Sequence, residues 1–134
     1  RVSSVYGEIL IRTNKLDEGI SYLEKAYELD PIPQGQSTSD RRICALLTGY
    51  YIADNLEKCS EMINKIVDVD FKSWLLSYDI FEKNNSFNKN EDWFKKGLTK
   101  FENIDVKLEV DRFHLNDKDL KNELIEKANK ILVT

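Results

Sequence analysis

The chain has 134 residues, of which 41% are hydrophobic and 33% are charged, a composition that is ordinary for a globular protein of one domain. Its formal net charge of −4 argues against a nucleic-acid-binding surface, which requires a clustered basic face. Its longest uncharged apolar stretch falls well short of the roughly 20 residues that cross a bilayer, so we expect no membrane insertion by this chain.

The first predicted element is a pair of helices joined by a tight turn. Apolar residues 9–11 mark a helix over residues 7–13, and Asn14 and Lys15 favour a turn. A second helix runs from the turn to Pro31, which cannot continue it. Its apolar positions repeat with a helical period: Leu16, Ile20, Leu23, Ala26 and Leu29.

Small residues on both helices of this pair allow close packing. The order and spacing of Gly7, Gly19, Leu23, Ala26 and Pro31 resemble the tetratricopeptide repeat (TPR), a family of stacked helical hairpins. The tryptophan that is usual in the family's first helix is absent, because Ser3 or Ser4 would occupy its place.

A loose five-residue pattern recurs along the chain. It consists of two apolar residues, any residue, a lysine, and a small or apolar residue. It lies around Lys25, Lys65, Lys96 and Lys127, at spacings of 40, 31 and 31 residues. The mean of these spacings equals the TPR period of about 34 residues, so the repetition favours a repeat protein. The alternative is an irregular helical bundle whose amphipathic stripes coincide by chance.

Residues 32–40 are predicted to form a loop, with Ser39 or Asp40 capping the next helix. Helices are then expected over residues 41–53 and 56–69, joined by a turn at Asp54 and Asn55. In that hairpin Cys44 and Cys59 would be offset by about 9 Å along the helix axis. That offset exceeds the reach of a disulfide, so we expect two reduced thiols, as is usual in the cytoplasm.

The next pair of helices is expected over residues 72–83 and 91–102, around a polar turn at residues 84–90. This turn lacks the central glycine and closing glutamate of a calcium loop, and we expect no metal there. Residues 104–115 alternate like a strand, although the helical context favours a helix. Asn116 is predicted to cap a last helix, with Lys127 and Lys130 suiting its C-terminal end.

The expected fold is therefore all-α, with one domain over residues 1–134. The TPR resemblance implies antiparallel hairpins at about residues 2–30, 41–70 and 72–102, and a degenerate hairpin at 104–132. It further implies that these hairpins stack as a right-handed superhelix with a C-terminal capping helix.

No catalytic, cofactor-binding or metal-binding motif is recognisable in the sequence. His114 is the only histidine, and neither Cys44 nor Cys59 lies in a known motif. Phosphate-binding glycine loops and serine-hydrolase elbows are absent from the sequence, so we do not expect an enzyme.

The resemblance instead implies a scaffold that binds a peptide or partner helix in a concave groove lined by the first helix of each repeat. The corresponding residues include Ser4, Glu8, Ile11, Arg12, Arg41, Ala45, Thr48, Ile52, Lys72, Leu75, Leu76 and Asp79. The apolar floor would come from Ile11, Ala45, Ile52, Leu75 and Leu76, and the cations for an acidic partner would be Arg12, Arg41 and Lys72. Alternatively, the apolar residues pack between repeats and leave an inert polar groove.

One TPR subfamily clamps C-terminal carboxylates of chaperones, and of its groove positions only Lys72 is retained here. The alternative function is a regulatory or structural appendage of a larger enzyme, membrane protein or transcription factor. The chain begins at Arg1 and not at a methionine, so we expect it to be a piece of a longer protein.

Overall fold

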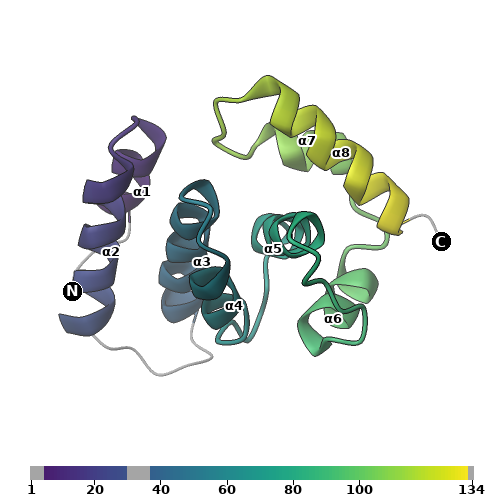
Figure 1. The fold of residues 1–134 in the computed structure, drawn as a ribbon, viewed down its shortest axis with the longest axis horizontal. Helices are drawn as coiled ribbons and strands as arrows, with labels where there is room; N and C mark the ends of the chain where they lie inside the picture. Colours follow the sequence, from purple (N-terminus) through teal and green to yellow (C-terminus); the bar gives the residue numbers. More distant parts are fainter. Residues whose placement is uncertain (1–4, 30–36, 133–134) are drawn as a thin grey trace. The chain divides into compact units, whose positions relative to one another are not determined.

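The computed structural model describes residues 5–29 and 37–132 of the chain (Figure 1). Within these ranges all regular structure is helical, which confirms the predicted all-α class. The helices are α1 (Val5–Arg12), α2 (Leu16–Leu29), α3 (Ser37–Ile52), α4 (Leu56–Ile63), α5 (Phe71–Lys83), α6 (Asp92–Lys100), α7 (Val106–Asp111) and α8 (Lys118–Leu132). They divide between two compact units, Arg1–Val69 and Asp70–Thr134.

The first unit contains two helical hairpins, α1–α2 and α3–α4. Helix α2 packs against both α1 and α3, and α1 also contacts α3. The turns that close the hairpins contain Asn14 and Asp54, whose φ angles are 64° and 57°. Asparagine and aspartate enter this left-handed region more readily than other side chains, because their short polar groups bond locally.

Close packing of α1 on α2 depends on glycine. A Cβ atom on Gly7 would lie 2.5 Å from Leu23 Cγ, and one on Gly19 would lie 2.7 Å from Ile11 Cγ1. Neither helix has room for a side chain at these points. The small residues predicted to bring the two helices together therefore lie where they meet.

Two helix ends in the first unit differ from the prediction. Helix α3 begins at Ser37, so residues 37–40 are helical and neither Ser39 nor Asp40 precedes the helix as a cap. Residues 32–36 of the predicted loop lie outside the described residues. Helix α4 ends at Ile63, six residues before the predicted end at Val69. Asn64 is its C-terminal cap residue, and the Asn64 Nδ2 group donates to Ser60 O at 2.8 Å.

In the second unit α5 is central and contacts α6, α7 and α8. Trp74 of α5 is fully buried, and its Nε1 donates to Phe94 O at 3.1 Å. Aromatic rings surround this tryptophan at centroid distances of 5.5–6.0 Å: Phe71, Phe94 and Phe101. A Cβ on Gly97 would lie 2.0 Å from Trp74 Nε1, so the missing side chain of Gly97 makes room for the indole.

The ambiguous segment after α6 contains a helix, α7. Asp105 precedes this helix and caps it, because its side chain accepts a hydrogen bond from the Leu108 N–H at 3.2 Å. Val106 and Val110, one turn apart, are buried, while Leu108 between them is exposed. The helical spacing of the two valines thus determines which side chains are buried here.

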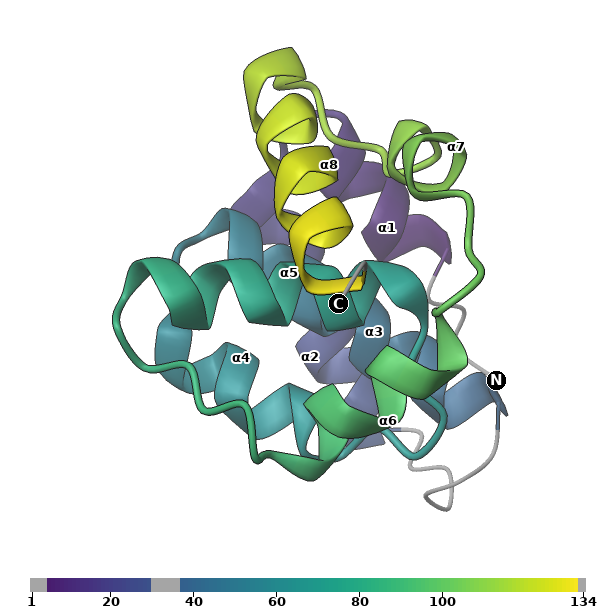
Figure 2. The same cartoon turned by 90° about the vertical axis from the view of Figure 1, so that its right-hand side faces the viewer.

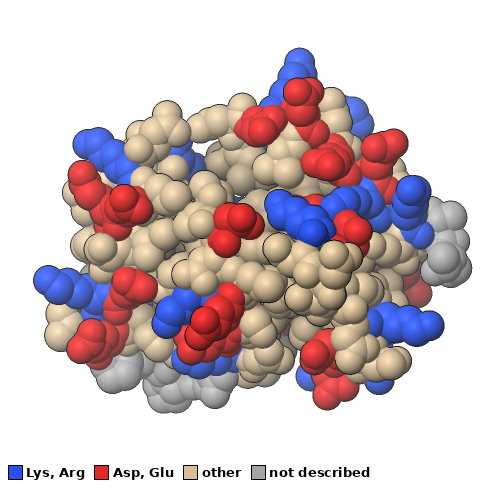
Figure 3. All heavy atoms as spheres, viewed as in Figure 1, with Lys and Arg blue, Asp and Glu red and all other residues tan. Residues whose placement is uncertain are grey.

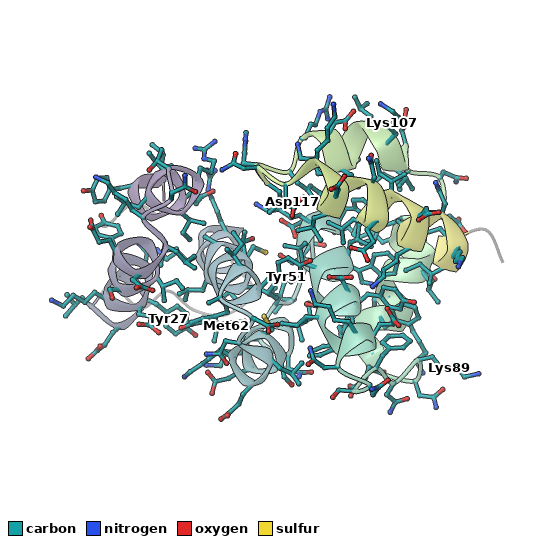
Figure 4. All side chains as sticks on the ribbon, turned by 45° about the horizontal axis from the view of Figure 1, so that its top comes forward. Tyr27, Tyr51, Met62, Lys89, Lys107 and Asp117 are labelled. Carbon is teal, nitrogen blue, oxygen red and sulfur yellow. The ribbon has the colours of Figure 1, made fainter. Side chains whose placement is uncertain are left out.

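The cap of the last helix is Asp117 and not the predicted Asn116. Asp117 lies at the beginning of α8 (Figure 4) and accepts a hydrogen bond from the Leu120 N–H through Oδ1 at 3.1 Å. Leu124 and Ala128 are the fully buried part of the predicted apolar stripe. In the same view Lys89 and Lys107 point away from the helices of the second unit.

Candidate interaction surfaces

The structure brings together predicted groove residues from α1 and α3. Glu8 Oε2 lies 3.4 Å from Arg41 Nε, and the Arg41 side chain is 61% exposed. Arg12, one turn beyond Glu8 on α1, is half-buried. These three charged side chains of the first unit are therefore accessible to a ligand.

The apolar groove residues of the first unit are less accessible. Ile11 is buried because its side chain packs against Gly19 and Gly49. Ala45 and Thr48 are also buried, and the Thr48 hydroxyl donates to Cys44 O at 3.0 Å. Ile52 is 41% exposed and is the member of the predicted floor that remains open to solvent.

Groove residues of α5 are mostly inside the protein. Leu75 and Leu76 are fully buried, Asp79 is 1% exposed, and Lys72 is half-buried. Leu75, Leu76 and Asp79 thus supply core side chains of the second unit. The sequence did not reveal which neighbours cover them.

Asp79 is the centre of a charged cluster between α5 and α8. Its Oδ1 atom accepts a short hydrogen bond from Lys127 Nζ of α8, and its Oδ2 atom lies 3.2 Å from Lys83 Nζ. Lys127 Nζ also lies 2.7 Å from Glu82 Oε1. One cation of α8 therefore bridges two carboxylates of α5.

Desolvation acts to lower the pKa of Lys127, but hydrogen bonds to Asp79 and Glu82 and the charges of these carboxylates outweigh it. The net effect is a pKa of Lys127 above the ordinary lysine value. Burial also raises the pKa of the neighbouring Tyr78, reinforced by Glu82 and opposed by Lys127. The cluster thus stabilises the charged form of Lys127.

The sequence placed Lys127 in the recurring lysine pattern and near the C-terminal end of its own helix, and gave it no partner on another helix. Asp79 and Lys127 are 48 residues apart, and a single sequence carries no signal that pairs them. Only the packing of α8 on α5 brings them together.

The remaining surface features are a shallow depression on α6, exposed apolar residues on the first hairpin, and the distribution of charge. A shallow depression of about 530 Å³ is lined by residues of α6 alone: Asp92, Lys95, Lys96, Thr99 and Lys100. On the first hairpin Tyr6, Ile9 and Leu29 are exposed, and the Tyr6 ring packs edge-on against Tyr22 at 4.9 Å. On the face drawn in Figure 3, acidic and basic side chains are interspersed and neither sign forms a continuous area.

His114 is exposed, Cys59 is buried, and both cysteines are thiols in the structure. Nowhere in the described ranges do three histidine, cysteine, aspartate or glutamate side chains come together as metal ligands. No helix formed by residues 5–29 and 37–132 has the length and hydropathy that crossing a bilayer requires.

Comparison of the chain with models of known protein families, with characterised proteins and with solved structures gives no match.

Proposed function

We propose that this chain is a non-catalytic scaffold for protein–protein interaction, whose first unit binds an acidic extended peptide or partner helix along α1 and α3. The contact between Glu8 and Arg41 carries the proposal. It joins the first helices of two successive hairpins at positions where a TPR-like repeat would receive its ligand. The packing of α2 against both α1 and α3 supports a TPR-like stacking of these hairpins.

Arg41 can exchange its partner Glu8 for a carboxylate of a bound peptide. An exposed ion pair contributes only about 0–1 kcal/mol to folding, so a carboxylate of a ligand competes for Arg41 at little cost to the protein. A guanidinium group also binds a carboxylate through two parallel hydrogen bonds. Arg12 adds a second cation on α1, and exposed Ile52 adds an apolar contact on α3.

The test is selection of binding peptides from a random displayed library, followed by fluorescence anisotropy with the best binder. Replacing both Arg12 and Arg41 with glutamate should lower the affinity for that peptide by at least about tenfold, because two favourable charge contacts become repulsive. Amide chemical shifts of α1 and α3 should change when the peptide is added.

The matched control is replacement of Lys95 and Lys96 with glutamate, which makes the same change in net charge on exposed positions of α6. This variant should retain the affinity of the wild-type chain. The proposal fails if no peptide is selected above background, or if the double arginine variant binds as tightly as the lysine variant.

A further inference from the structure

The surface of α5 that carries Asp79 is occupied by a helix of the same chain. Helix α8 crosses α5 (Figure 2), and Lys127 of α8 bonds Asp79 and Glu82 of α5. Asp79 is one of the positions at which a TPR-like repeat receives its ligand. In the second unit, a helix of the chain itself therefore lies where a partner is expected.

The contact is selective for a cation. Asp79 is 1% exposed. If a helix without a cation docked at this point, the buried carboxylate would lose one of the positive charges that offset the cost of its desolvation. Lys83, which lies 3.2 Å from Asp79 Oδ2, belongs to α5 itself and stays when α8 leaves. Lys127 supplies the charge that comes from the docking helix.

Helix α8 packs on α7 as well as on α5, and it has an apolar side and a charged side. Leu124 and Ala128 are fully buried on α8, whereas Lys127 and Glu82 keep 21% and 44% of their side chains exposed. The outer side of α8 carries exposed charged residues, among them Glu123, Glu126 and Lys130. An amphipathic helix of this kind remains soluble when it is detached.

We propose that α8 is the resident occupant of an acceptor surface on α5, and that a partner protein docks there by displacing it with an amphipathic helix of the same pattern. That pattern is an apolar residue, a lysine three residues later and a small residue next, as in Leu124, Lys127 and Ala128. The inference goes beyond the proposed function, which concerns α1 and α3 of the first unit, and rests with it on a TPR-like arrangement of the hairpins.

The first test is hydrogen–deuterium exchange on the unmodified full chain. Amides of α8 should exchange at least about tenfold faster than amides of α5, because the proposed detachment opens α8 while α5 stays folded. Equal protection of α8 and α5 would mean that α8 leaves only on global unfolding, which would overturn the inference.

The second test uses a fluorescent peptide of residues 117–132 as the probe. It should bind the Leu124→Ala chain at least about tenfold more tightly than the wild-type chain, since a weakened resident helix competes less. A peptide with Lys127→Glu should not bind, whereas one with Lys130→Glu, which has the same net charge, should bind normally. Equal binding of the two glutamate peptides would overturn the proposal.

The two sets of experiments are separable. If Leu124→Ala does not fold, exchange in the wild-type chain still decides whether α8 detaches. Peptide selection on α1 and α3 reports on the proposed function, and the behaviour of α8 reports on this inference alone.

Discussion

Tyr50 links two helices of the first unit through one hydroxyl group. Its hydroxyl donates to Glu24 Oε2, so α3 is joined to α2 by a hydrogen bond to a charged acceptor. Burial, followed by the hydrogen bond and charge of Glu24, raises the pKa of Tyr50 well above the ordinary tyrosine value. The protonated phenol is therefore favoured in the folded state.

We predict that Tyr50→Phe lowers the free energy of unfolding by about 1 kcal/mol at neutral pH. A raised folded pKa means that this contribution is fully present below about pH 10, where tyrosine is protonated in both states. As the pH rises further, the unfolded chain releases the proton first, so the difference between wild type and variant shrinks.

Urea unfolding at neutral and alkaline pH measures both effects. Tyr6→Phe, at an exposed position, is the control and should unfold like the wild-type protein. A difference between wild type and Tyr50→Phe that is constant across pH would contradict the assigned role of the hydroxyl.

At the scale of elements, the α1–α2 hairpin depends on one face of α2. Leu23 is 1% exposed and packs against Gly7, whereas Leu29 on the same helix is 72% exposed. Both leucines belong to the predicted apolar stripe. The helical period identifies a candidate face of α2, but it does not show how much of that face a neighbouring helix covers.

Leu23→Ala should lower the free energy of unfolding by about 2–5 kcal/mol, because it empties a closely packed site. Leu29→Ala removes the same atoms from an exposed position and should change stability by less than about 0.5 kcal/mol. Chemical unfolding followed by circular dichroism compares the pair. Equal losses in the two variants would contradict the packing of α1 on α2.

At the scale of the whole molecule, the chain separates into two compact units, and both tryptophans lie in the second. Tryptophan fluorescence therefore reports on the second unit, while circular dichroism reports on helices of both. Single-domain behaviour over residues 1–134, as the sequence predicts, would make the two signals change together.

We expect Gly97→Ala to destabilise the second unit by about 1–3 kcal/mol, because the new methyl group meets the buried Trp74 indole. Its fluorescence transition should move to lower urea, while Leu23→Ala should move mainly the circular dichroism transition. Thr99→Ala, on the exposed side of α6, is the control. If both variants shift both signals equally, the chain unfolds as one cooperative domain.

The sequence by itself determined the helical class, the turns at Asn14 and Asp54, and the close packing of the first hairpin at its small residues. These features follow from local properties, namely the spacing of apolar residues and the backbone preferences of glycine, asparagine and aspartate. Helix ends were less predictable: α4 ends at Ile63 and not at the predicted Val69.

Only the tertiary structure decided which predicted surface residues are buried. Leu75, Leu76 and Asp79 satisfy the spacing of a groove, yet they are inside the protein. The partner of Asp79 is Lys127, 48 residues further along the chain. Periodicity shows that a helix has an apolar face, but which element covers that face is settled by long-range packing, because each helix can meet any other that offers a complementary surface.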